Sequence, residues 1–152
     1  MSDTAHIQAV TLDKFLTAWK DQAVEDTIAL WSDDFKQQLL PSSLGVPSHS
    51  RAESEKIYPK LTGSLRNWKL DIKEVVHDVG RGTAAVYATS QADTPLPNEK
   101  WTTDFSIFLS FTEDGLRVNR LDEMVDSGFY ADYFPKFQQW LRENMSPKEE
   151  SH

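Results

Sequence analysis

Residues 100–126, KWTTDFSIFLSFTEDGLRVNRLDEMVD, contain the pattern that decides the fold. Apolar and polar side chains alternate over residues 100–112 and again over residues 116–126, which is the period of a β-strand. Asp114-Gly115 between these stretches is a strong signal for a tight hairpin turn. We therefore expect two neighbouring antiparallel strands in this part of the chain.

The same strand period extends upstream, so the expected sheet is larger than one hairpin. It covers residues 67–79 and 83–91, separated by a glycine-rich turn. The phase of the alternation slips near Lys73-Glu74, which predicts a β-bulge. Downstream of the hairpin, Ser127 is expected to cap a closing helix that contains Pro135.

The first third of the chain has the spacing of helices. One helix is expected over residues 12–19 with Thr11 as its cap, and a second apolar stripe runs through residues 24–35. A third helix should start near Ser50, and Pro59 should kink or end it. Helices followed by consecutive strands predict an α+β domain with an antiparallel sheet.

Length and composition limit the possible classes of protein. With 152 residues, 39% of them hydrophobic, the chain can fill one core, so we expect one domain over residues 10–143 with loose tails at 1–9 and 144–152. The lack of cysteine excludes disulfides and thiolate chemistry, and the net charge of −8 argues against nucleic acid or an anionic membrane as a partner. No membrane helix and no signal peptide are recognisable, so we expect a soluble, cytoplasmic protein.

Three stretches of sequence together match a family pattern. They are the proline-serine-leucine segment of residues 40–47, the aromatic-x-x-carboxylate-aromatic run of residues 101–105, and the Arg-x-x-Glu-x-x-Asp strand of residues 120–126 after the hairpin turn. In this order they resemble the SnoaL-like group of the nuclear-transport-factor-like (ketosteroid-isomerase-like) superfamily, and its fungal members in particular. The resemblance covers roughly residues 10–142.

The resemblance implies a strongly curved antiparallel sheet wrapped around helices, forming a cone with an internal pocket. It also implies a homodimer through the outer sheet face and cofactor-independent chemistry on metabolites of polyketide or terpenoid type. The family often has a histidine just before the proline-serine-leucine segment. This chain has Gln37 and Gln38 there, which argues against a histidine base on that element.

Glu123 is the leading candidate for chemistry. It shares strand parity with Leu121 and Val125, so we expect it on the apolar face, which lines the pocket in the fold it resembles. An apolar pocket raises the pKa of a carboxyl group by desolvation, and the group can then take and return protons near neutral pH. The alternative is a structural carboxylate paired with Arg117 or Arg120.

Two further groups are candidates for proton transfer. Counting outward from the hairpin turn places Asp104 near Glu123, either on the same face or, after a one-residue slip, on the opposite face. His77 alternates with Val75 and Val79 on an expected strand, where a purely structural role is the alternative.

Aromatic residues supply the candidates for substrate binding. Tyr87 and Tyr58 could donate a phenolic hydrogen bond to a substrate oxygen. Trp31, Trp101 and Phe105 could stack on a flat ligand, although aromatic side chains in a domain of this size are also ordinary core residues.

The sequence therefore favours a cofactor-independent isomerase, cyclase or dehydratase that acts on a small, apolar, oxygenated metabolite. We expect no metal and no organic cofactor, because no cysteine and no suitably spaced pair of histidines is available as a ligand set. The strands at 83–91 and 101–112 are apolar or small on both faces, which favours a homodimer. The alternative function is a non-catalytic domain that holds a ligand or another protein.

Overall fold

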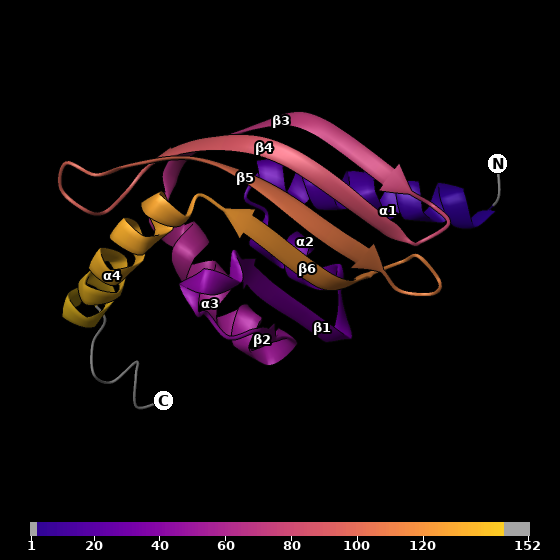
Figure 1. The fold of residues 1–152 in the computed structure, drawn as a ribbon, viewed down its shortest axis with the longest axis horizontal. Coiled ribbons are helices and arrows are strands. Elements are labelled where there is room, and N and C mark those ends of the chain that lie inside the picture. Colours follow the sequence, from indigo (N-terminus) through magenta and orange to yellow (C-terminus); the bar gives the residue numbers. More distant parts are fainter. Residues whose placement is uncertain (1–2, 145–152) are drawn as a thin grey trace.

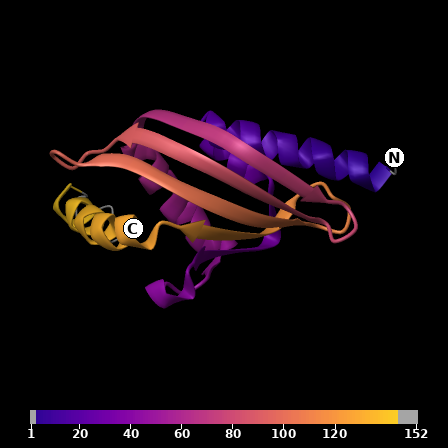
Figure 2. The same cartoon turned by 45° about the horizontal axis from the view of Figure 1, so that its top comes forward.

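The computed structural model describes residues 3–144, and Figures 1 and 2 show one sheet that bends around the helices. No helix within this range is long and apolar enough to cross a membrane. The α+β architecture expected from the sequence is confirmed. The elements are α1 (Asp3–Lys20), α2 (Val24–Ala29), β1 (Trp31–Leu40), η1 (Ser42–Leu44), β2 (His49–Ser50), α3 (Arg51–Ser64), β3 (Arg66–Asp78), β4 (Thr83–Asp93), β5 (Lys100–Phe111), β6 (Val118–Val125) and α4 (Ser127–Asn144).

The sheet has the strand order β2-β1-β6-β5-β4-β3. Strands β3 to β6 pair antiparallel as predicted, and the expected bulge is present because the β3–β4 register shifts between Ile72 and Glu74. Strand β1 instead pairs with β6 in parallel, which places Leu39 beside Glu123. Because β1 and β6 are not joined by a hairpin, no turn signal in the sequence could predict this pairing.

The apolar stripe of residues 24–35 does not form one helix. Helix α2 ends at Ala29, and Trp31 and Phe35 lie on β1. Residues four positions apart share a face in a helix and also in a strand, so their spacing fits both structures. In the strand, the two rings are buried and stack with centroids 4.5 Å apart.

Helix α1 begins at Asp3, whereas a loose tail was expected up to residue 9. Thr11 lies inside this helix and does not cap it, and its hydroxyl donates to the carbonyl oxygen of Gly115 over 2.6 Å. Gln8 is buried and hydrogen-bonds to His77 over 2.9 Å. These contacts hold α1 against β3 and the β5–β6 turn. Residues 145–152 of the expected C-terminal tail lie outside the described residues.

Helix α3 begins where the sequence predicts. The Ser50 hydroxyl accepts from the backbone N–H of Glu53, and the Glu53 carboxylate accepts from the backbone N–H of Ser50, which forms a capping box. Pro59 does not end the helix, which continues to Ser64. The cap therefore fixes the start of the helix that forms one wall of the cavity described below.

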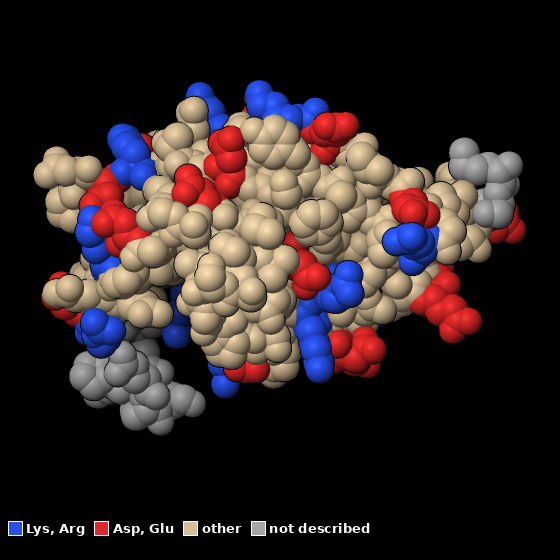
Figure 3. Space-filling view, in the orientation of Figure 1, with Lys and Arg blue, Asp and Glu red and all other residues tan. Residues whose placement is uncertain are grey.

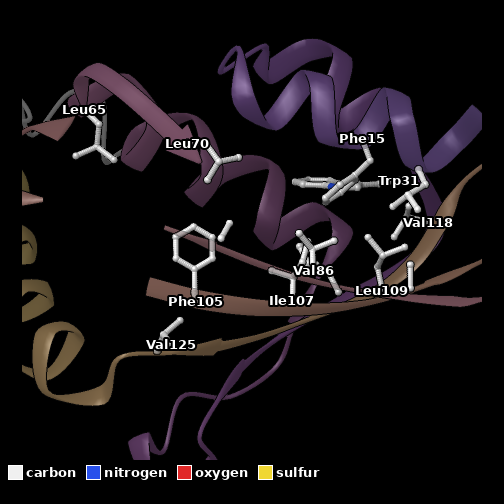
Figure 4. Packing of buried hydrophobic residues seen from close by; sticks show 14 of the residues in the cluster. Phe15, Trp31, Leu65, Leu70, Val86, Phe105, Ile107, Leu109, Val118 and Val125 are labelled. Carbon is white, nitrogen blue, oxygen red and sulfur yellow. The ribbon is translucent and has the colours of Figure 1, made fainter. Parts of the chain in front are cut away.

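The core lies between the helices and one face of the sheet, as Figure 4 shows. Phe15 from α1 and Trp31 from β1 lie over Val86, Ile107 and Leu109, and none of these five side chains is more than 3% exposed. On β4 and β5, inward residues alternate with outward ones. The parity of a residue therefore decides whether it faces the helices or the outside.

The outer face of the sheet carries exposed apolar side chains. Phe108 is 42% exposed and pairs in register with Ala85, which pairs in turn with Val76. Tyr87 and Met124 are also exposed and flank this row. We call these five residues the outer patch. Figure 3 shows Lys and Arg side chains interspersed with Asp and Glu on the face in view, without a continuous basic area.

We propose that the chain forms a homodimer through the outer patch, because a single sheet has only one face covered by its own helices. Sedimentation at micromolar concentration should give a dimer, and Phe108→Asp should convert it to a monomer. Leu116→Asp is the control, since Leu116 is also apolar and exposed but lies in the β5–β6 turn. A monomer for the unsubstituted chain would contradict the proposal.

Candidate active site

A cavity of about 630 Å³ lies between the sheet and helices α1, α3 and α4. Its walls are mainly apolar and aromatic. The aromatic part of the lining includes Trp19, Trp31, Trp68, Trp101, Phe105 and Phe134. A few polar side chains interrupt these walls, and a largely apolar cavity with a small number of polar groups is the usual form of a small-molecule site.

Glu123 lies on β6 and faces this cavity. It shares its face with Leu121 and Val125, as the sequence predicts, and pairs in register with Ile107 on β5. Its other neighbour in the sheet is Leu39 on β1. Protein surrounds the carboxyl group, which stays partly exposed because it opens onto the cavity.

The surroundings of Glu123 change its proton affinity. Burial raises the pKa of Glu123 to about 7, although a hydrogen bond from the Gln37 side-chain amide to Oε1, 3.0 Å long, opposes the rise. The carboxyl group is therefore divided between its acid and base forms near neutral pH. This is the condition under which one group can both remove and return a proton.

An ion pair of Glu123 with Arg117 or Arg120 was the structural alternative, and neither arginine is among the described contacts of Glu123. Nε of Arg120 lies 3.3 Å from Oδ2 of Asp122, and the side chain of Glu123 is hydrogen-bonded to Gln37. The hydrogen-bond partner, Gln37, comes from β1, the strand that pairs in parallel with β6. An uncharged partner leaves the carboxylate without a neutralising charge, which keeps its pKa high.

Two tyrosines line the same cavity. Tyr58 comes from α3, and its ring centroid lies 5.8 Å from that of Trp31. Burial raises the pKa of the Tyr58 phenol, while hydrogen bonds with Thr27 and Thr62 oppose the rise. Tyr130 comes from the first turn of α4 and is 6% exposed. Burial raises the pKa of Tyr130 well above its ordinary value, and the charge of Glu123 makes a smaller contribution in the same direction.

Asp104 and Tyr87 do not reach the cavity. Phe105, Ile107 and Leu109 point inward on β5, so Asp104 has outward parity, and the Tyr87 hydroxyl donates to its carboxylate over 2.9 Å on the outer face. The hydrogen bond and the charge of Asp104 raise the pKa of Tyr87. The sequence had left the face of Asp104 open, and the register resolves it against a carboxylate pair with Glu123.

His77 also lies away from the cavity. Its ring makes an edge-to-face contact with Phe111, with centroids 5.6 Å apart. Its Nε2 forms a hydrogen bond with the Gln8 side chain of α1. The contact with Phe111 lies within the sheet, between β3 and β5, and the hydrogen bond with Gln8 attaches α1 to the sheet. The structure therefore favours the structural alternative for His77.

Trp31, Trp101, Phe105 and Tyr58, which were expected to contact the substrate, all line the cavity. Their role in binding stays a prediction. Trp101 is held edge-to-face by Phe129, Tyr130 and Tyr133 of α4, so this helix closes one end of the aromatic wall.

Two groups of the site were not predicted from the sequence. Gln37 stood out only as a departure from the family pattern, and Tyr130 was not among the candidates. A signal for Gln37 existed only after β1 was known to be a strand beside β6. Tyr130 stands among other aromatic residues of α4, so nothing local distinguishes it.

No three His, Cys, Asp or Glu side chains within residues 3–144 come together in a way that could hold a metal ion. We expect dialysis against a chelator to leave both the melting temperature and the catalytic rate unchanged, because the proposed acid–base group needs no bound cation. A fall in either quantity that added metal restores would contradict this expectation.

The chain has close relatives among fungal proteins. It is 61% identical over 142 residues to "Monooxygenase nsrS" of Aspergillus novofumigatus, covering 93% of this chain and 95% of the relative. It is 38% identical over 137 residues to the "Ergochrome gene cluster protein" of Claviceps purpurea, covering 90% and 88% of the two chains. A scan against protein-family models finds no match. The enzyme name of the first relative supports the expectation of an enzyme.

Solved structures confirm the expected fold. The BvnE pinacolase of Penicillium brevicompactum superposes with a TM-score of 0.78 at 17% identity, covering 91% of this chain and 95% of that one. A Catenulispora acidiphila protein described as having a ketosteroid isomerase-like fold superposes with a TM-score of 0.59 at 8% identity, covering 74% and 82%. At these identities the likeness concerns the fold alone.

Proposed function

Because the chain belongs to the family of fungal proteins that includes monooxygenase nsrS, we propose that it is an enzyme of natural-product metabolism that moves protons through Glu123. The reaction is an isomerisation, ring closure or dehydration of a small, largely apolar, oxygenated metabolite. The observation that carries the proposal is a carboxyl group with a pKa of about 7 in an aromatic cavity of about 630 Å³. The relative named for an ergochrome gene cluster supports the metabolic context.

The chemistry begins with removal of a proton from a carbon next to a carbonyl group. The Glu123 carboxylate accepts this proton, and the electron pair of the C–H bond moves toward the carbonyl oxygen to give an enolate. Return of the proton to another carbon completes an isomerisation. Attack of the enolate on a second carbonyl closes a ring, and loss of hydroxide with a proton completes a dehydration. The aromatic walls orient the carbon skeleton and keep water out.

This proposal can be tested before the natural substrate is known. β-Tetralone is a flat, two-ring ketone with acidic C–H bonds and is small enough for the cavity. In heavy water, the acidic hydrogens of β-tetralone should exchange for deuterium faster with the unsubstituted protein than with the Glu123→Gln variant. NMR of β-tetralone follows the exchange. Equal exchange by the two proteins would contradict proton transfer by Glu123.

The names of the relatives favour a second candidate, a monooxygenation. It would use the same first step, because an electron-rich carbanion reacts with O₂ more readily than its neutral parent. Oxidation of a CH₂ group to a carbonyl supplies all four electrons that O₂ accepts, and the second oxygen atom leaves as water. The two candidates differ in the mass of the product formed from the natural substrate. Isomerisation and ring closure keep the mass, and dehydration lowers it by one water. Incorporation of label from heavy-oxygen gas would establish the oxygenase instead.

The cavity also bears on the non-catalytic alternative. A domain that only binds a ligand needs no titratable group at the ligand, whereas an acid–base enzyme does. Glu123 lines the cavity, which supports the enzyme.

A further inference from the structure

Tyr130 is a polar group of the cavity for which proton transfer by Glu123 gives no role. Tyr130 is buried, with only 6% of its surface exposed, and it lines the same cavity as Glu123. Its ring makes aromatic contacts, but its hydroxyl has no hydrogen-bond partner among residues 3–144. A hydroxyl of a cavity-lining residue that has no partner within the protein is a donor available to a bound molecule.

The position of this hydroxyl is fixed by its surroundings. The backbone N–H of Tyr130 donates to the carbonyl oxygen of Asp126 over 3.0 Å, which sets the first turn of α4. The ring lies between Phe134 and Trp101, with centroid distances of 4.8 and 5.8 Å. A donor held in this way needs no reorganisation when charge appears on a bound molecule.

The other hydroxyl groups of the cavity are less suited to this task. Thr27 and Thr62 lie beside the Tyr58 hydroxyl and lower the pKa of its phenol, so they compete with a bound molecule for this group. The Ser54 hydroxyl has no partner either, but it is sealed from solvent. Tyr130 lines the cavity, and its hydroxyl is not among the groups that are sealed from solvent.

Tyr130 and Glu123 also have complementary states. Burial and the charge of Glu123 hold the pKa of Tyr130 high, so the phenol keeps its proton and remains a donor at neutral pH. Once Glu123 has accepted a proton it is neutral, and the negative charge is on the substrate. A neutral acid and a neutral phenol then face an anionic oxygen.

We propose that Tyr130 donates a hydrogen bond to the substrate oxygen that becomes negative when Glu123 removes the proton. The inference rests on the proposed function. In this step the C–H proton goes to the Glu123 carboxylate, and the C–H electron pair forms a carbon–carbon double bond. The carbonyl π pair moves to the oxygen that Tyr130 holds. Return of the proton reverses these movements, so no oxidant or reductant is required.

The test measures the binding of an oxyanion to the intact protein. The Glu123→Gln variant represents the state with a neutral group at that position, and para-nitrophenolate above the pKa of its phenol represents the enolate. Adding Tyr130→Phe should weaken para-nitrophenolate binding by about 10-fold or more, which is typical of a hydrogen bond to a charged group. Nitrobenzene, which lacks the phenolic oxygen, should bind both proteins equally.

Tyr133→Phe in the same background is the matched control, because Tyr133 lies on the same helix but does not line the cavity. It should change the affinity of neither probe. Equal binding of para-nitrophenolate with and without Tyr130→Phe would overturn the inference, as would equal weakening of both probes, which indicates ring packing. Failure of both probes to bind the Glu123→Gln protein would also overturn it. The proposed function would still stand if the unsubstituted protein exchanges β-tetralone hydrogens faster than Glu123→Gln.

Discussion

Replacing Glu123 with Gln should lower turnover by at least about 100-fold, which is the usual contribution of a positioned acid–base group. The amide cannot accept a proton from the substrate, but it has nearly the same shape as the carboxyl group. Its side-chain oxygen can still accept the hydrogen bond from Gln37. The fold should therefore persist, and circular dichroism with a melting curve on the same sample checks it.

Asp104→Asn is the matched control for this experiment. It makes the same carboxyl-to-amide change on β5, but on the outer face, where Asp104 bonds to Tyr87. The control should keep the rate of the unsubstituted protein. A Glu123→Gln variant that turns over normally would remove Glu123 from the mechanism, and a loss of rate in Asp104→Asn would show that the outer face matters to the chemistry.

The same Glu123→Gln variant should be more stable than the unsubstituted protein at alkaline pH, by up to about 3 kcal/mol. The reason is that folding raises the pKa of Glu123 from 4.5 to about 7. Between these two values the folded protein holds a proton that the unfolded chain has released. The contribution of Glu123 to stability therefore falls as pH rises through this window, and it is constant above it. Gln carries no charge at any pH and avoids this loss.

Urea unfolding of both proteins at a series of pH values measures the effect. The difference in unfolding free energy should be near its maximum above pH 7 and should disappear below pH 4.5, where Glu123 becomes protonated in both states. Other carboxyl groups titrate in both proteins, so the difference isolates Glu123. A variant that is less stable than the unsubstituted protein at alkaline pH would indicate a structural carboxylate instead.

The alternation of apolar residues was sufficient to predict strands β3 to β6 and the face of Glu123. Residues 100–126 predict two strands and a turn, and the parity of Leu121 and Val125 places Glu123 inward, as the structure shows. Local patterns of this kind depend only on the period of a strand, so they can be read without knowing the pairing. The start of α3 near Ser50 and the bulge in β3 were also predicted from local patterns.

The missing parts of the site depend on contacts between distant segments. The face of Asp104 follows from the register across the hairpin, where one residue of slip reverses the answer. The contact between Gln37 and Glu123 exists because β1 pairs in parallel with β6, and no sequence signal marks that pairing. Trp31 was predicted at the site, but its spacing fits both helix and strand, and only the fold places it on β1.

The most direct test of the account is the protonation of Glu123 itself. Carbon NMR of carboxyl-labelled protein gives the titration of each glutamate, and the resonance absent from the Glu123→Gln variant identifies Glu123. We expect a midpoint near pH 7 for this resonance, because desolvation in the cavity raises the pKa of Glu123 and the hydrogen bond from Gln37 offsets only part of this rise. A midpoint near 4.5, the ordinary value for glutamate, would contradict it.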